Sequence, residues 1–181
     1  MKRGEPPFRV AWGQALASIR VRFWRHALTA SGVALGIAFF SSVQASRLLQ
    51  RSSDPFEVQR LQWMAATSLL MCLVGVTNSM LMSVTERYRE IGTIKCLGAS
   101  DGFIVKVFFL ESVILGTAGA LSGSMVGTLA IGLVDGFEAA PLLEAIGLGT
   151  AVGLAMTILA ATAPAVQAAR MPAAAALRVD V

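Results

Sequence analysis

The chain has 181 residues, of which 55% are hydrophobic and 14% are charged, and its formal net charge at pH 7 is +4. This composition excludes an ordinary soluble domain. It is typical of polytopic helical membrane proteins, in which each membrane-spanning segment satisfies its own backbone hydrogen bonds.

Residues 1–26 predict a short polar tail followed by an amphipathic helix. Apolar residues recur every three or four positions from Phe8 to Ala27, as on one face of a helix, and arginines lie mainly on the remaining surface. A basic amphipathic helix that contains tryptophans is expected to lie in the membrane interface. The alternative is a basic tail that only sets the orientation of the protein in the membrane.

Two uncharged spans follow, at residues 27–46 and 61–84. A helix of about 20 residues is about 30 Å long, which is enough to cross the hydrocarbon core. The first span carries Gly32 and Gly36 at the spacing that permits close helix packing. In the second span, Asn78 is expected to be either an interhelical hydrogen-bond partner or, less commonly, a substrate ligand.

The long polar run between two hydrophobic spans is Thr85–Ser100. Its apolar residues form a helical stripe and charges of both signs occupy the other side, which predicts an amphipathic helix over residues 85–97. Gly98 is well placed to cap the C-terminus of this helix. A face with mixed charges suits a protein partner better than an anionic lipid surface, which favours net positive charge. The alternative is a connector in the membrane interface that has no partner.

A long helix over residues 103–134 is expected to contain the third span, and residues 145–163 form the fourth. The third span carries two overlapping GxxxG steps on one face, which is a stronger packing signal than a single pair. The expected helix-packing residues of the spans are Gly32, Gly36, Gly116, Gly119, Gly123, Gly127, Gly149 and Gly153.

Glu111 is the one acidic residue at the entry to a span. It is either a buried functional carboxylate or, more commonly, a residue near the interface that orders the charged run together with Lys106 or Arg89. Further along the chain, Pro164 is expected to end or to kink the fourth helix.

The distribution of Lys and Arg predicts the orientation of the spans. Twelve of these residues lie before the first span, in the charged run and its continuation, or after the fourth span, whereas three lie between the first two spans. By the positive-inside rule, both termini and the charged run lie in the cytoplasm. We therefore expect a multi-pass protein of the cell inner (plasma) membrane.

The segment of residues 78–100 strongly resembles the FtsX-like permease family of ABC transporters, of the MacB and LolC type. In that family a TER-x-REIG-x-x-K-x-x-GA motif follows the second transmembrane helix. The resemblance extends to residues 25–40, to Glu111 with the glycine pattern of the third span, and to the C-terminal segment from Pro164. The positions that match the motif, and that the resemblance implies couple to an ATPase, are Thr85, Glu86, Arg87, Arg89, Glu90, Ile91, Gly92, Lys95, Gly98 and Ala99.

The resemblance implies an all-α permease domain with four transmembrane helices over residues 27–181. It implies a homodimer, or a heterodimer with a second permease, in the lipid bilayer. A separate cytoplasmic ABC ATPase subunit is the implied partner, with residues 85–97 as the coupling helix. The sequence has no phosphate-binding loop, catalytic pattern or metal-ligand cluster, so we expect no enzyme activity, cofactor, metal or nucleic-acid partner.

The sequence departs from the family at the first outer loop. Members carry a folded periplasmic domain between the first two spans, whereas residues 47–60 are too few to bury a core of their own. The resemblance implies a permease subunit that couples ATP hydrolysis to export or mechanotransmission, with a periplasmic adaptor as a further candidate partner. The alternatives are an FtsX-like regulator that relays the ATPase state to a periplasmic or cell-wall partner without transport, and a structural half-permease that no longer couples.

Overall fold

The computed structural model describes residues 8–50 and 54–170, and within these residues the secondary structure consists of helices joined by short turns, without strands. They are α1 (Phe8–Val21), α2 (Phe23–Gln50), α3 (Pro55–Glu86), α4 (Tyr88–Cys96), α5 (Asp101–Asp135) and α6 (Ala139–Arg170). Four of them, α2, α3, α5 and α6, are long and apolar enough to cross a membrane. The prediction of an all-α protein with four membrane-spanning helices is therefore confirmed. The expected polar tail and most of the C-terminal segment lie outside the described residues.

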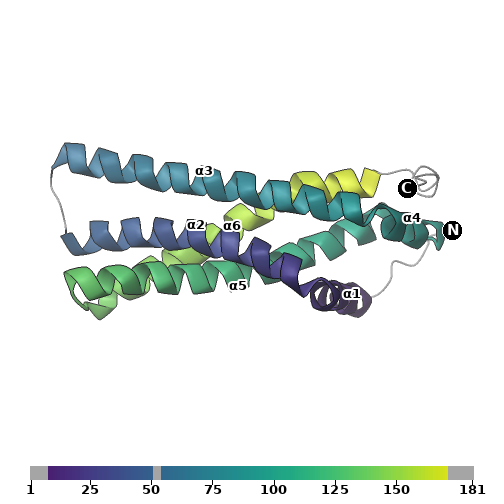
Figure 1. Ribbon diagram of the computed structural model, residues 1–181, viewed down its shortest axis with the longest axis horizontal. Coiled ribbons are helices and arrows are strands. Elements are labelled where there is room, and N and C mark those ends of the chain that lie inside the picture. Colours follow the sequence, from purple (N-terminus) through teal and green to yellow (C-terminus); the bar gives the residue numbers. More distant parts are fainter. Residues whose placement is uncertain (1–7, 51–53, 171–181) are drawn as a thin grey trace.

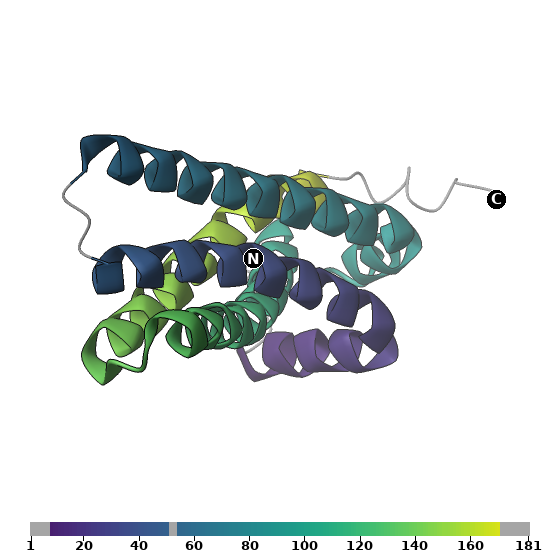
Figure 2. The same cartoon turned by 60° about the vertical axis from the view of Figure 1, so that its left-hand side comes forward.

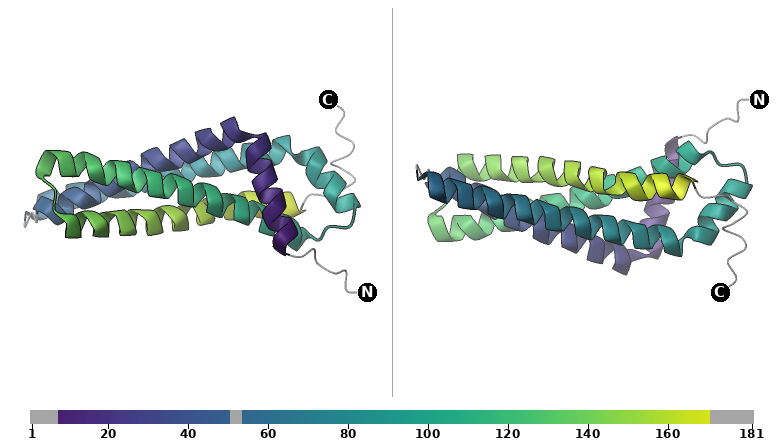
Figure 3. Two further views of the ribbon diagram at one scale, coloured as in Figure 1. Left: turned by 90° about the horizontal axis from the view of Figure 1, so that it is seen from below. Right: turned by 90° about the horizontal axis from the view of Figure 1, so that it is seen from above.

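The four long helices run side by side along the longest axis of the molecule, and α1 and α4 lie at one end of them (Figure 1). At this end α1 crosses the direction of the long helices rather than continuing α2 (Figure 3). We call it the junction end. The end of α2, the start of α3 and the connection from α5 to α6 lie at the opposite end (Figure 2).

Local sequence signals explain where the helices begin. The Asp54 carboxylate accepts a hydrogen bond from the Phe56 backbone N–H at 3.1 Å, and Pro55 occupies the first position of α3. The Ser100 hydroxyl accepts from the Phe103 N–H in the same way at the start of α5. Such caps satisfy backbone donors that have no partner within the helix.

Helix α5 is the central element of the bundle. Half of the residues in its most apolar window, 50%, are buried inside the structure, compared with 33% for α2, 28% for α6 and 22% for α3. Its glycines permit this burial, because a β-carbon at Gly123 or Gly127 would overlap backbone atoms of Ala34 or Ala38 on α2. The backbones of α5 and α2 therefore lie in direct contact along this face.

The other predicted packing glycines fall into two groups. At Gly36, Gly116, Gly149 and Gly153 a β-carbon would lie closer than 3.0 Å to a side-chain atom of another helix, and at Gly119 it would meet α2. At Gly32 no such atom lies within 4 Å. Of the small-residue pair on α2, Gly36 alone packs against another helix within residues 8–50 and 54–170, where it meets Cys72 of α3.

Helix α6 does not end at Pro164 but continues to Arg170. A proline within a helix leaves the carbonyl four residues earlier without its N–H donor. Here that carbonyl belongs to Ala160, and the Thr77 hydroxyl of α3 donates to it at 3.5 Å. A neighbouring helix thus supplies the donor that the proline removes, as membrane-spanning helices require.

Helix α1 packs through its smallest side chains. Ala11 and Ala15 are buried against Phe103, Val107 and Leu110 of α5. Most of the larger apolar residues of α1 and of the start of α2 are exposed, whereas Ile19 is half-buried. The exposed ones are Val10, Trp12, Leu16, Val21, Phe23 and Trp24. Most of the predicted apolar stripe therefore stays exposed, and the stripe breaks at Arg22, where α1 ends and α2 begins.

The contact between α2 and α5 predicts that substitutions at two glycines differ clearly in their effect on stability. We expect Gly127→Ala to lower the free energy of unfolding by about 1–3 kcal/mol, because its methyl group overlaps backbone that cannot rotate away. Gly32→Ala should change it by less than about 0.5 kcal/mol, because the site is open. Unfolding of both variants by SDS in detergent micelles, followed by circular dichroism, measures this difference. Equal unfolding midpoints for both variants would contradict the packing described.

Candidate functional site

A buried carboxylate organises the junction end. The Glu111 side chain on α5 is 1% exposed. Its Oε2 accepts a hydrogen bond from Arg87 Nη1 at 3.0 Å, and its Oε1 lies 3.0 Å from His26 Nε2 on α2. The Ser18 hydroxyl of α1 donates to the same Oε1 at 3.3 Å. One carboxylate thus joins α1, α2, α5 and the break between α3 and α4.

Arg87 compensates the burial of this charge. Its side chain is 12% exposed, and its guanidinium lies 5.4 Å from the centre of the Phe108 ring as well as 3.3 Å from the Glu90 carboxylate. A buried carboxylate is tolerated only when it is paired and hydrogen-bonded. Of the two alternatives for Glu111, the structure shows a buried group that orders the charged run. Arg87 reaches it, whereas the predicted partners Arg89 and Lys106 are exposed.

The backbone at Arg87 explains this difference. The chain leaves the helical conformation there, with φ −102° and ψ 13°, so that α3 ends at Glu86 and α4 begins at Tyr88. The sequence predicts one continuous helix over residues 85–97. In such a helix the Arg87 side chain would point in another direction than it does at the observed break. The break turns the segment, and the arginine at the break meets α5.

Two further ion pairs surround the buried one. Arg22 Nη2 lies 2.6 Å from Glu90 Oε1, and the Arg25 guanidinium pairs with the Glu86 carboxylate. All four side chains are partly exposed, so each pair contributes little to stability and is weakened by salt. They connect the start of α2 directly to the end of α3 and to α4.

Lys95 lies inside the junction rather than on its surface. Its side chain is 10% exposed; Nζ lies 2.8 Å from Asp101 Oδ1 and donates a hydrogen bond to the Ala169 carbonyl near the end of α6. A cation at a helix C-terminus satisfies terminal carbonyls and interacts favourably with the helix dipole. The motif lysine therefore ties α4 to α6.

The prediction that Gly98 caps α4 is confirmed. Gly98 has φ +99°, a conformation that glycine adopts without strain. Its N–H donates to the Lys95 carbonyl at 2.9 Å, and the Ala99 N–H donates to the Ile94 carbonyl at 3.2 Å. These two bonds form a Schellman motif, which reverses the chain from α4 into α5.

The motif residues divide by the direction in which they point. Ile91 is buried with Val84, Phe108 and Ala165, where three other helices meet. The inward residues of the motif are Arg87, Ile91, Gly92 and Lys95, and the exposed ones are Thr85, Glu86, Arg89 and Glu90. Gly98 and Ala99 are half-buried. The spacing of the motif did not distinguish these groups.

Sequence reasoning missed several residues of the junction. Arg22 and Arg25 counted only toward charge topology, and His26 carried no assigned role. Leu97, which follows α4, is 84% exposed although it is a large apolar residue. It belongs to the apolar stripe that predicts the helix over residues 85–97, but it lies after the end of α4, directly before the turn at Gly98. Together with Arg89, Thr93 and Cys96 it gives α4 an exposed outer surface.

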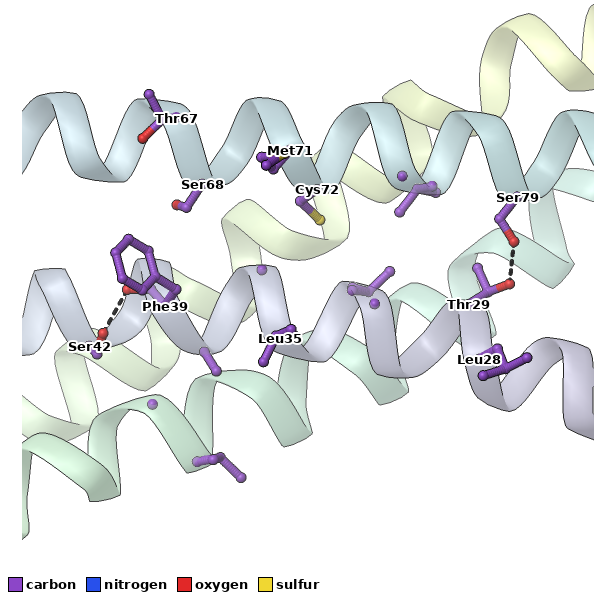
Figure 4. A pocket seen from close by; sticks show the side chains of 18 of the residues that line it. Leu28, Thr29, Leu35, Phe39, Ser42, Thr67, Ser68, Met71, Cys72 and Ser79 are labelled. Atoms are coloured by element: carbon purple, nitrogen blue, oxygen red, sulfur yellow. Dashed lines mark hydrogen bonds between the residues drawn. The ribbon is translucent and has the colours of Figure 1, made fainter.

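Two grooves adjoin these elements. One, of about 480 Å³, lies between α1, α4 and α5 and has Arg22, Arg87 and Glu90 at its polar side. The other, of about 920 Å³, lies mainly between α2 and α3 (Figure 4). Most of its lining is apolar, and its hydroxyls bond within the chain, as in the 2.5 Å contact between Thr29 and Ser79. Neither groove holds a group of three or more potential metal ligands in the described residues.

Comparisons with known proteins relate this architecture to membrane permeases. A family model described as FtsX-like permease C-terminal matches residues 63–173. The chain is 38% identical over 119 residues to the ABC transporter permease YknZ of Bacillus subtilis, covering 64% of this chain and 30% of YknZ. It is 36% identical over 113 residues to the macrolide export ATP-binding/permease protein MacB of Wolinella succinogenes, covering 59% of this chain and 17% of MacB.

A third relative is the pyoverdine export ATP-binding/permease protein PvdT of Pseudomonas savastanoi, which is 37% identical over 105 residues and is covered over 13% of its length. The chain thus matches less than a third of the length of each of these relatives. The matched region includes α4, the break at Arg87 and Glu111.

The buried pair predicts strong coupling between two substitutions. Glu111→Gln leaves the Arg87 charge buried without its counter-ion, so we expect the free energy of unfolding to fall by about 3–5 kcal/mol. Adding Arg87→Met should restore part of this loss, because the unpaired charge is gone. Glu90→Gln, at an exposed pair, should cost less than about 1 kcal/mol. Unfolding titrations of the wild type, Glu111→Gln, Arg87→Met, the double variant and Glu90→Gln measure these energies, and strictly additive effects of the first two changes would argue against a direct pair.

Proposed function

The chain belongs to the FtsX-like permease family, and we propose that it is the membrane subunit of an ABC transporter, coupled to a separate ATPase subunit. The observation that carries this proposal is the buried pair between Glu111 and Arg87. Because this pair fixes α4 to α5, a force applied to the outer surface of α4 acts on the membrane-spanning bundle rather than on a loose connector. Relatives named as ABC transporter permeases support the same role.

The proposed orientation places the junction end in the cytoplasm. Twelve Lys and Arg residues lie in segments assigned to this side, against three on the other. In this orientation both termini are cytoplasmic and the protein lies in the inner (plasma) membrane. The exposed Trp12 and Trp24 then lie at the level where tryptophan side chains favour the membrane interface.

The proposed contact with the ATPase is the outer surface of α4. Arg89 and Glu90 supply exposed charges of both signs, and Leu97 supplies an apolar side chain that water does not favour. An apolar anchor within a polar rim is the usual composition of a protein interface. The inward motif residues Arg87 and Lys95 hold α4 in place and do not take part in the contact.

The end of the bundle opposite the junction end differs from that of family members that carry a periplasmic domain. Helix α2 ends at Gln50 and α3 begins at Pro55, so no folded domain lies between them. In this proposal, the periplasmic domain that responds to movement of the membrane helices belongs to another polypeptide, either a second permease or a periplasmic adaptor. Export and mechanotransmission both fit this arrangement. The second candidate function, an FtsX-like regulator of a periplasmic or cell-wall partner, is favoured by the same short connection.

We expect Arg89→Glu combined with Leu97→Ser to reduce co-purification of an ABC ATPase, identified by mass spectrometry, at least tenfold. The two side chains are exposed, so the unfolding midpoint should stay unchanged. The matched control is Phe137→Ser, an exposed apolar residue at the opposite end of the bundle, which should retain the ATPase. Undiminished binding and ATPase stimulation in the double variant would rule out the α4 surface as the contact. A flux assay in reconstituted vesicles then separates transport from regulation.

A further inference from the structure

The groove between α1, α4 and α5 combines charged and apolar side chains in one place. It has a volume of about 480 Å³ and lies at the junction end, where these helices meet (Figure 1). Arg22 and Glu90 form an ion pair at its polar side, and the buried side chains of Phe103 and Phe108 line its apolar part. Such a groove fits a ligand that is charged at one end and apolar at the other.

The position of the groove brings it next to lipid headgroups. The four long helices, which are apolar enough to cross a membrane, end at one membrane surface together with the groove. There α1 runs across the direction of the long helices (Figure 3), the arrangement expected of a helix in the plane of the surface. Its exposed Trp12 and Leu16, with Trp24 at the start of α2, are side chains that this surface favours. We therefore expect lipid molecules directly beside the groove.

The charge on this side of the groove favours a negatively charged headgroup. Residues 8–50 contain no aspartate or glutamate, so α1 and the start of α2 carry arginines without acidic residues of their own. Arg20 is exposed, and Arg22 and Arg25 meet carboxylates only from α3 and α4. Basic residues at the membrane surface attract anionic lipids, whereas a zwitterionic lipid adds a cation that they repel.

Arg22 has hydrogen-bonding capacity that the described residues leave unused. A guanidinium has five N–H donors, and within the described part of the chain this side chain donates only from Nη2, to Glu90 Oε1 at 2.6 Å. Its Nη1 has no hydrogen-bond partner there. The bond to Glu90 is also replaceable, because the Glu90 side chain is 55% exposed and such pairs contribute little to stability. Arg87, which lines the same groove, is instead held by the buried Glu111.

We propose that this groove binds the headgroup of an anionic phospholipid, with the phosphodiester on Arg22 and the acyl chains along the exposed apolar residues of α1. Two N–H groups of a guanidinium match two oxygens of a phosphate in geometry, which makes arginine well suited to this ligand. The exposed Gln14 lines the same groove and can hydrogen-bond the hydroxyls of a glycerol headgroup.

Glu90 is the competitor of the phosphate for Arg22. A bound headgroup therefore weakens one connection between α4 and the turn that joins α1 to α2, while the buried pair of Glu111 and Arg87 stays in place. This site goes beyond the proposed function. It requires that the long helices cross a bilayer, and it is independent of whether an ATPase binds α4.

Native mass spectrometry of the purified full chain, without any ATPase, measures the binding. Phosphatidylglycerol added to the detergent solution should bind tightly as one molecule per chain, and phosphatidylcholine at least fivefold more weakly. Arg22→Gln should weaken phosphatidylglycerol binding about fivefold or more, the contribution expected of one basic residue at an anionic membrane surface. The matched control is Arg170→Gln, which removes an exposed cation from the end of α6, a helix that does not line the groove. It should leave the affinity unchanged.

Glu90→Gln tests the competition between carboxylate and phosphate. Because it frees Arg22 for the lipid, it should tighten phosphatidylglycerol binding about two- to fivefold, in the range of one exposed ion pair. A folding defect cannot imitate this gain. Glu57→Gln, which removes the partner of Arg60 at the opposite end of the bundle, is the control and should have no effect.

Four outcomes overturn the proposal. They are equal affinities for phosphatidylglycerol and phosphatidylcholine, wild-type binding by Arg22→Gln, unchanged or weaker binding by Glu90→Gln, and equal losses in Arg22→Gln and Arg170→Gln. The last would show attraction by overall charge without a defined site. Glycerol 3-phosphate, which has the phosphate but no acyl chains, should not displace the lipid at equal concentration. Displacement would assign the groove to a soluble phosphate instead of a lipid.

Discussion

The buried ion pair between Glu111 and Arg87 is the constraint on which the junction end depends. A carboxylate that is 1% exposed needs a counter-ion and hydrogen bonds. The groups that meet this need come from α1, from α2 and from the break between α3 and α4. Satisfying one charge therefore fixes the positions of helices that are far apart in the sequence. The partly exposed ion pairs around it orient the helices but contribute little to stability.

The same pair divides the charged segment into two functional surfaces. Residues that face the bundle, such as Arg87 and Lys95, connect α4 to α5 and α6. Residues such as Arg89 and Leu97 face outward, and no contact within the described chain explains why they are exposed. A rigid attachment on one side and an open surface on the other are what a helix needs in order to pass an external force into a membrane bundle.

Periodicity and composition predicted the four long helices. The place of Gly98 after the last apolar residues of the charged segment predicted that it caps α4, in agreement with its positive φ. The partner of Glu111 could not be predicted, because one non-helical residue at Arg87 changes which arginine reaches α5. Pro164 likewise required tertiary information, since the Thr77 hydroxyl that supplies the missing donor is distant in sequence. Gly32 and Gly36 have the same local pattern, and only the position of α3 distinguishes them.

The packing of the bundle is uneven, and this has consequences for motion. Helices α2 and α5 touch through backbone at Gly123 and Gly127, so they cannot slide without steric overlap. Helix α3 contacts its neighbours through side chains, with the Cys72 contact at Gly36 and a few hydroxyl bonds, and it is the least buried of the long helices. It is also joined to α4 through a single residue, Arg87. Because Arg87 and Lys95 attach α4 to α5 and α6, a displacement of α4 acts on these two helices. The movement that disrupts the least packing within the bundle is that of α3 relative to them.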